Sequence, residues 1–216
     1  MSNEELRHAV DEELSWEPRV DNAAVAVETQ AGIVTLRGTV GSLRERFEAR
    51  KAAKRVYGVR SVNDELEVRI LGEKSRDDAD LRGAVLQALM LDSEVPSSVD
   101  ARAKNGVVTL TGTVTYYFER EEAESVTSKV SGVSSIDDQI ELRPPGPSAD
   151  DVHHSIKKAL ERNAKIDAAD ISVDSSHGTV RLFGVVDSWA NHDAAVAAAW
   201  AAPGVTKVED EIVVDY

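Results

Sequence analysis

The stretch GIVTLRGTV, from Gly32 to Val40, decides the fold of this chain because it occurs three times. Close copies are GVVTLTGTV at Gly106–Val114 and GTVRLFGVV at Gly178–Val186, which follow after 74 and then 72 residues. Self-similarity over this distance indicates a repeat, and each repeat is long enough to be a small domain. We therefore predict three domains, at residues 2–74, 75–144 and 147–216.

Each repeat has the same order of apolar patterns. In the first repeat, Leu6, Val10 and Leu14 recur at helical spacing, and the alternation around Val25 and Val27 predicts a strand. The quoted stretch is a second strand, joined to the first by a hairpin at its first glycine. An alanine-rich helix and a last strand follow. The predicted fold class is α+β, with three tandem αββαβ domains, each with two helices packed on a three-stranded sheet.

Two further glycines in every repeat are predicted to be structural. One is the second glycine of the quoted stretch, which falls on the apolar face of its strand and indicates that another backbone passes close by. We expect that neighbour to be the second helix of the same domain. The other glycine follows that helix and suits a left-handed helix end. The six positions are Gly38, Gly58, Gly112, Gly132, Gly184 and Gly204.

Composition excludes several classes of protein. The 216 residues carry a net charge of −14 and include no cysteine. Nucleic acid is disfavoured as a partner because phosphate binding needs clustered lysine and arginine, and disulfides are excluded. No apolar run approaches the roughly 18 residues of a transmembrane segment. Since MSNEELRHAV at the start has neither a basic region nor an apolar core, we expect a cytoplasmic protein.

The pattern resembles the BON domain, three times over. The segments that carry the resemblance are GIVTLRGTV…GVRSVNDELEV, GVVTLTGTV…GVSSIDDQIEL and GTVRLFGVV…GVTKVEDEIVV. The resemblance implies a bacterial, non-enzymatic module associated with binding of phospholipids or other ligands, envelope maintenance and hyperosmotic stress. Most members are periplasmic, and cytosolic members of the wider family include potassium-binding ones. No catalytic or binding residue carries over, because the motif residues are fold residues.

No catalytic constellation is recognisable in the sequence. The five histidines share no metal-ligand spacing, so we expect no enzyme, no cofactor and no metal site. Asp64, Asp138 and Asp210 occupy one position in all three repeats, where a bond to nearby backbone is the favoured role. We expect a non-catalytic binding or scaffolding protein of BON type, linked to osmotic or general stress. One alternative is cation binding, of potassium or calcium, by an acidic repeat such as residues 118–124 or 209–211.

The second helix of the first repeat, SLRERFEARKAAKR, departs most from an ordinary surface. With its alanines facing the sheet, a phenylalanine surrounded by basic residues falls on the outer face. This suits an anionic phospholipid surface or a protein partner, although covering a neighbouring repeat of the same chain is the slightly favoured role for such an aromatic residue. The sequence does not set the oligomeric state. The candidate binding residues are Leu43, Arg44, Phe47, Arg50, Lys51, Lys54 and Arg55.

Overall fold

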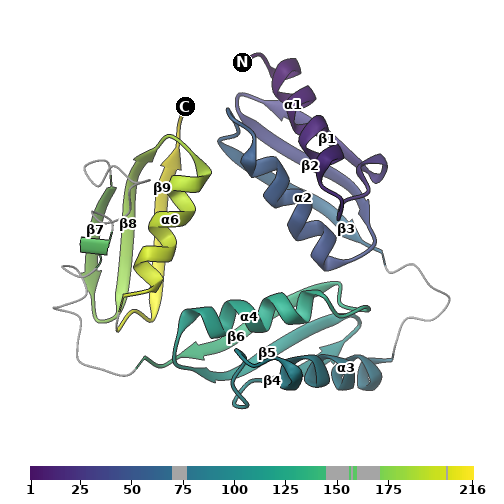
Figure 1. Cartoon of the computed structure of the whole chain (residues 1–216), viewed down its shortest axis with the longest axis vertical. Helices are drawn as coiled ribbons and strands as arrows, with labels where there is room; N and C mark the ends of the chain where they lie inside the picture. Colours follow the sequence, from purple (N-terminus) through teal and green to yellow (C-terminus); the bar gives the residue numbers. More distant parts are fainter. Residues whose placement is uncertain (70–76, 145–155, 157, 160–170, 203) are drawn as a thin grey trace. The chain divides into compact units, whose positions relative to one another are not determined.

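The computed structural model describes residues 1–69, 77–144, 156, 158–159, 171–202 and 204–216. These residues form three separate sheets of three strands, each accompanied by helices (Figure 1). The strand orders are β1-β2-β3, β4-β5-β6 and β7-β8-β9. The predicted fold class of three tandem α+β domains is therefore confirmed. The polar segment LGEKSRDD at residues 71–78 and the proline-rich segment RPPGPS at 143–148, which we predict to be linkers from their composition, lie largely outside the described residues.

The same order of elements recurs in each domain. The first domain contains α1 (Asn3–Trp16), the short 3₁₀ helix η1 (Asn22–Ala24), β1 (Val25–Gln30), β2 (Ile33–Val40), α2 (Leu43–Arg55) and β3 (Ser61–Val68). The second contains α3 (Asp78–Leu91), β4 (Asp100–Lys104), β5 (Val107–Val114), α4 (Tyr117–Ser128) and β6 (Ser135–Leu142). The third contains β7 (Ile171–Ser176), β8 (Thr179–Val186), α6 (Trp189–Trp200) and β9 (Lys207–Val214).

The first helix that we predict for the third domain, from Val152, Ile156 and Leu160 at helical spacing, lies almost entirely outside the described residues. Of the three apolar residues that predict it, only Ile156 is described, and its side chain is fully buried in the core of that domain. Within the described part of the chain, no helix is long and apolar enough to cross a membrane.

Each sheet combines an antiparallel hairpin with a parallel crossover. In the first domain β1 pairs antiparallel with β2, with Gln30 opposite Ile33. The two residues between them, Ala31 and Gly32, have φ values of 50° and 82°. Positive φ at both central positions is the type I′ turn, which matches the twist of the strands. The chain then returns through α2, and β3 lies parallel to β2, as a helical crossover requires.

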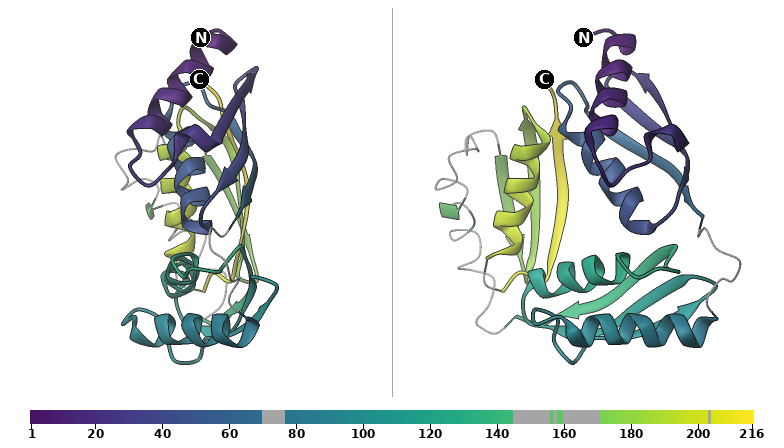
Figure 2. Two further views of the ribbon diagram at one scale, coloured as in Figure 1. Left: turned by 90° about the vertical axis from the view of Figure 1, so that its right-hand side faces the viewer. Right: turned by 45° about the vertical axis from the view of Figure 1, so that its right-hand side comes forward.

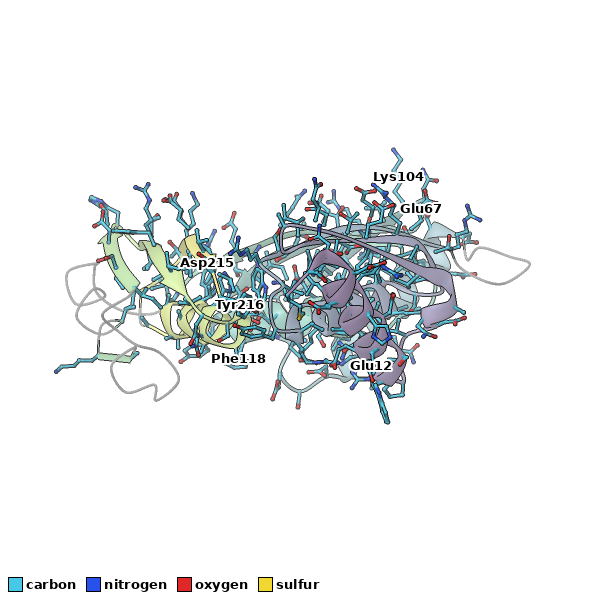
Figure 3. All side chains as sticks on the ribbon, turned by 90° about the horizontal axis from the view of Figure 1, so that it is seen from above. Glu12, Glu67, Lys104, Phe118, Asp215 and Tyr216 are labelled. Carbon is cyan, nitrogen blue, oxygen red and sulfur yellow. The ribbon has the colours of Figure 1, made fainter. Side chains whose placement is uncertain are left out.

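The two helices of the first domain cover one face of its sheet and leave the other face open (Figure 2). The covered face is the core, where the apolar row of α1, the alanines of α2 and the inward residues of β2 are buried. Glu67 projects from the opposite side of the domain to Glu12 of α1 (Figure 3). On the open face Arg37 bridges Glu28 and Glu65, at 2.6 and 2.7 Å, so that face of the first domain is polar.

The strand glycines approach a different backbone from the one predicted. A Cβ on Gly38 would lie 2.0 Å from the Ala24 carbonyl oxygen, and one on Gly112 would lie 2.2 Å from the Ser98 carbonyl oxygen. At Gly38 and Gly112 the closest neighbour is therefore the segment that enters the adjacent strand, and not the second helix as expected. Glycine is required at these positions, because the backbone at the start of β1 and just before β4 leaves no room for a Cβ atom. Gly38, Gly112 and Gly184 have φ values of 130°, 128° and 147°.

The glycines that follow the second helices also have positive φ, with values of 92° at Gly58, 108° at Gly132 and 86° at Gly204. Helix α2 itself ends earlier, with an extended C-cap at Val56. Gly58 therefore belongs to the tight turn that leads into β3, two residues beyond the cap.

Candidate binding surface on helix α2

Helix α2 is fixed at its start by two side chains. The Ser42 hydroxyl accepts the Glu45 N–H at 3.1 Å, as an N-cap does. The Glu45 carboxylate in turn accepts the N–H groups of Gly41 and Asp21, both at 2.8 Å. The start of α2 is thus tied both to the end of β2 and to the segment before β1, and this holds the orientation of its outer face.

One candidate on the outer face proves to be buried. Leu43 is only 3% exposed, so the prediction that it joins the binding surface is wrong. Helical side chains lean toward the N-terminus of their helix, and Leu43 is the first residue of α2. Its side chain therefore covers the turn that precedes the helix instead of lying beside Phe47.

Two of the candidate arginines are held by carboxylates of their own domain. Arg44 contacts Glu48 at 2.6 Å, and Arg55 contacts Glu13 and Glu17 at 2.7 and 3.3 Å. Glu48, although only 4% exposed, also meets Arg19 at 2.9 Å. Burial of a carboxylate requires such partners. Arg44 and Arg55 consequently belong to an ion-pair network that joins α1 to α2.

The remaining candidates form a smaller basic surface around an aromatic ring. Phe47 is half-buried, Arg50 and Lys51 are exposed, and Lys54 is half-buried. The Arg50 guanidinium carbon lies 5.9 Å from the centre of the Phe47 ring, within the range of a cation–π interaction. We call Phe47, Arg50, Lys51 and Lys54 the Phe47 patch.

The other two domains do not repeat this surface. The positions equivalent to the Phe47 patch are Glu121, Glu124, Ser125 and Ser128 in α4, and Asp193, Val196, Ala197 and Trp200 in α6. A common fold therefore carries a basic, aromatic surface in the first domain and acidic or apolar surfaces in the others.

A second recurring arrangement joins each second helix to the last strand. Asp64 accepts Arg46 Nε at 2.9 Å and the Leu66 N–H at 3.1 Å. In the second domain Arg120 and the Ile140 N–H make the same bonds to Asp138. The predicted backbone bond is therefore present, and the helix residue is a partner that sequence reasoning missed. The sequence could have revealed this partner, because an arginine follows the second glycine by eight residues in both domains.

The third domain changes the helix partner in this arrangement. His192 stands where the others have arginine, with Nε2 2.8 Å from Asp210 Oδ2 and Nδ1 2.9 Å from Asp193 Oδ1. The Ile212 N–H still donates to Asp210, at 3.1 Å. These contacts tie the second helix of the third domain to its last strand.

Three residues of the acidic stretches, Glu122, Glu209 and Glu211, have basic partners within their own domains. Lys129 meets Glu122 at 3.6 Å, and Arg181 meets Glu209 and Glu211 at 3.0 and 3.3 Å. No cluster of three or more histidine, cysteine or acidic side chains suited to a metal ion exists among the described residues. Nothing in the described geometry thus favours the cation-binding alternative.

One carboxyl group in the second domain has an unusual environment. Burial, together with the nearby charge of Asp138, raises the pKa of Glu124 to about 7. The carboxyl groups of Glu124 and Asp138 interact through a hydrogen bond, so one of them holds a proton well above the usual range for a carboxylic acid.

Comparison with known proteins identifies the repeated unit. The chain is 35% identical over 129 residues to the osmotically-inducible protein Y of Escherichia coli (strain K12). That alignment covers 57% of this chain and 64% of the relative, which is less than two thirds of the relative's length. Two solved structures of CdsD, a structural protein of the type III secretion system of Chlamydia trachomatis, are 15% identical to this chain. The first match covers 98% of this chain and 92% of that one with a TM-score of 0.27. The second, a C-terminal domain, covers 100% of both with a TM-score of 0.28.

The family model described as the BON domain matches at residues 2–70, 77–144 and 148–216. These three segments include nearly the whole chain and coincide with the three sheets and their helices. The resemblance in the sequence is thereby confirmed: the chain belongs to the BON domain family, of which it carries three copies in tandem.

Proposed function

We propose that this chain is a non-catalytic binding and scaffolding protein of the osmotic or general stress response, which acts in the cytoplasm. Its first domain attaches the chain to anionic phospholipid surfaces through the Phe47 patch. Family membership and the 35% identity to an osmotically inducible protein support the stress role.

The observation that carries the membrane role is the Phe47 patch itself. Arg50 and Lys51 are exposed beside an aromatic ring on the outside of α2, and neither the second nor the third domain has this combination. A basic helix face with an aromatic residue suits the boundary of an anionic bilayer, where the ring enters the headgroup layer. Each basic residue near such a surface contributes about 1 kcal/mol.

The rest of the molecule sets the conditions for binding. The net charge of −14 repels an anionic surface, so attachment by two or three cations is weak and depends strongly on salt. We expect the full-length protein to co-sediment with phosphatidylglycerol-containing vesicles at low ionic strength, and not with vesicles of phosphatidylcholine alone.

A pair of matched double variants tests the site. Arg50→Glu with Lys51→Glu should abolish co-sedimentation, whereas Arg102→Glu with Lys104→Glu should reduce it much less. The second pair makes the same change in charge at exposed residues of β4. Phe47→Ser should weaken binding at fixed salt. The membrane role is refuted if the unmodified chain stays in the supernatant with anionic vesicles at low ionic strength, or if both double variants lose binding equally.

A further inference from the structure

The outer edges of β1 and β4 differ in a way that the common fold does not require. In a two-residue hairpin, the residues that flank the turn bond to each other, and bonded pairs then alternate along the strands. Since Gln30 faces Ile33 across the turn, the N–H and C=O groups of Ala26, Glu28 and Gln30 point toward β2. Those of Val27 and Thr29 point away from the sheet.

In the second domain the domain's own side chains close this edge at one residue, Ala101. Ala101 is the counterpart of Val27, and its N–H donates to Asp100 Oδ1 at 2.7 Å. Its carbonyl accepts Arg82 Nε at 2.6 Å, and Arg82 Nη2 also bonds Asp100 Oδ1 at 3.1 Å. We call this arrangement the Arg82–Asp100 clip. It occupies both outward groups of Ala101, as covered edges in native sheets do.

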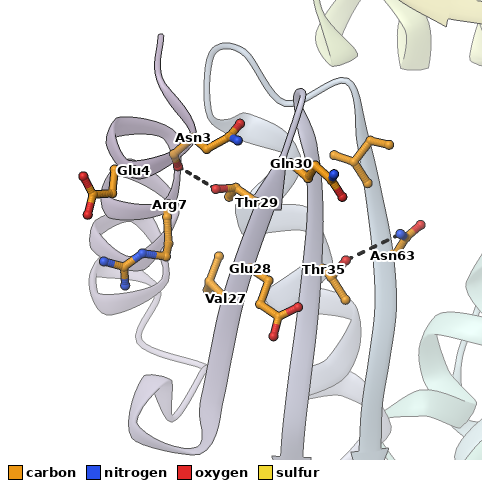
Figure 4. A pocket seen from close by; sticks show the side chains of 10 residues that line it. Asn3, Glu4, Arg7, Val27, Glu28, Thr29, Gln30, Thr35 and Asn63 are labelled. Atoms are coloured by element: carbon orange, nitrogen blue, oxygen red, sulfur yellow. Dashed lines mark hydrogen bonds between the residues drawn. The ribbon is translucent and has the colours of Figure 1, made fainter.

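In the first domain the clip is absent. Ala26 stands where the second domain has Asp100, so it has no carboxylate for the Val27 N–H. Arg7, the counterpart of Arg82, instead meets Asp11 at 3.3 Å on its own helix, and its guanidinium points away from β1 (Figure 4). Among the described residues, no side chain bonds to the outward groups of Val27.

The open section of the edge has definite ends. Beyond Thr29, the Ala31 N–H donates to Asn3 Oδ1 at 3.0 Å. At the other end, the Val25 N–H donates to the Asn22 carbonyl. Between these ends, Val27 and Thr29 offer two N–H groups and two carbonyls. A groove of about 650 Å³ adjoins this section, lined by the start of α1 and by β1, and it continues over Thr35 of β2 and Asn63 of β3 (Figure 4).

We propose that this groove binds a short extended peptide segment of a partner protein, which adds as a fourth strand beside β1. Main-chain hydrogen bonds to Val27 and Thr29 hold it, as in other cases of strand addition to an exposed sheet edge. Among the charged side chains that line the groove, Glu28 is paired with Arg37 and Arg7 with Asp11. Glu4 has no such partner among the described residues, so the occupant carries a basic residue beside Glu4. This proposal is independent of membrane binding by α2.

The probe is an acetylated and amidated pentapeptide of alternating lysine and valine, added to the full-length protein labelled with ¹⁵N. We expect the amide signals of Val27 and Thr29 to shift in a saturable manner, and those of Ala101 and Ala103 to stay in place. The same peptide N-methylated at every amide should not bind, because it cannot donate to the edge carbonyls. Absence of shifts at Val27 and Thr29, or equal binding of the N-methylated peptide, overturns the proposal.

Exchange of the clip between the domains is the sharper test. Ala26→Asp supplies the missing carboxylate and should weaken binding about tenfold or more. The added charge by itself would attract a basic peptide, so weaker binding reports closure of the edge. Thr39→Asp, with the same charge on β2 away from this edge, is the control and should not weaken binding. Conversely, Asp100→Ala should open the second domain and produce new shifts at Ala101. Unchanged affinity of the Ala26→Asp variant would contradict the proposal.

Discussion

Replacement of Gly112 by alanine should destabilise the second domain severely, whereas the same replacement at Gly83 should stabilise it. A Cβ at position 112 would lie 2.2 Å from the Ser98 carbonyl oxygen and 3.1 Å from the Val99 Cα. Ordinary contact begins near 3.4 Å, so the start of β4 would have to move by about 1 Å. Overpacking of this kind costs about 1–3 kcal/mol. The φ value of 128° adds about 1–3 kcal/mol for a residue with a side chain.

The expected loss of about 2–6 kcal/mol is a large part of the stability of a small domain, about 0.05–0.15 kcal/mol per residue. At Gly83, in the middle of α3, an added Cβ meets nothing within 4 Å, and alanine should gain about 0.5–1 kcal/mol through helix propensity. Urea denaturation of the full chain, followed by NMR at the amides of β5, measures both effects in one domain. An unchanged midpoint for Gly112→Ala would show that the close approach to Ser98 does not constrain this residue.

Two further variants test the electrostatics of the second domain and the hairpin of the first. The raised pKa of Glu124, about 7 against 4.5, contributes stability that is fully present below pH 4.5 and is lost as the pH rises through 7. Glu124→Gln should therefore match the unmodified chain at pH 5 and exceed its unfolding free energy by about 1 kcal/mol at pH 8, once solvent screening is allowed for. The same NMR-monitored denaturation at both pH values is the measurement, with Glu94→Gln as an exposed control, and a difference that does not change with pH would contradict the assignment. Ala31→Asn places in the first hairpin the Asn-Gly turn that the second domain has, and at a φ of 50° it should raise the unfolding free energy by about 0.5–1 kcal/mol. Ala23→Asn should not raise it, and a lower midpoint for Ala31→Asn at the amides of β2 would refute the turn assignment.

Local periodicity accounts for the parts of the fold that could be predicted from the sequence. Leu6, Val10 and Leu14 recur at the helical period, and all three are buried. The residues that face inward on β2 alternate with polar ones, and the structure buries Val34, Leu36 and Val40. Such patterns report which side of an element meets the core, and this is enough to order helices and strands within a repeat.

The features that could not be predicted depend on contacts between residues distant in sequence. Leu43 lies on the predicted outer face by its position on the helical wheel, yet it is buried, because it begins α2 and its side chain leans toward the preceding turn. The neighbour of Gly38 depends on the path of the chain into β1, which no pattern in β2 records. Arg44 and Arg46 look alike in the sequence, yet one pairs with Glu48 and the other with Asp64. Only the packed domain separates a structural arginine from Arg50 of the Phe47 patch.

The histidine that replaces arginine in the third domain changes the donor chemistry of one contact between helix and strand. A guanidinium is charged at every pH a cell encounters and always donates. A neutral imidazole has a single N–H and can donate to one carboxylate at a time, while a protonated ring donates from both nitrogens. His192 has a carboxylate at each nitrogen, Asp193 at Nδ1 and Asp210 at Nε2. A neutral His192 ring can therefore donate to only one of its two carboxylates, a limit that the guanidinium groups of Arg46 and Arg120 do not have.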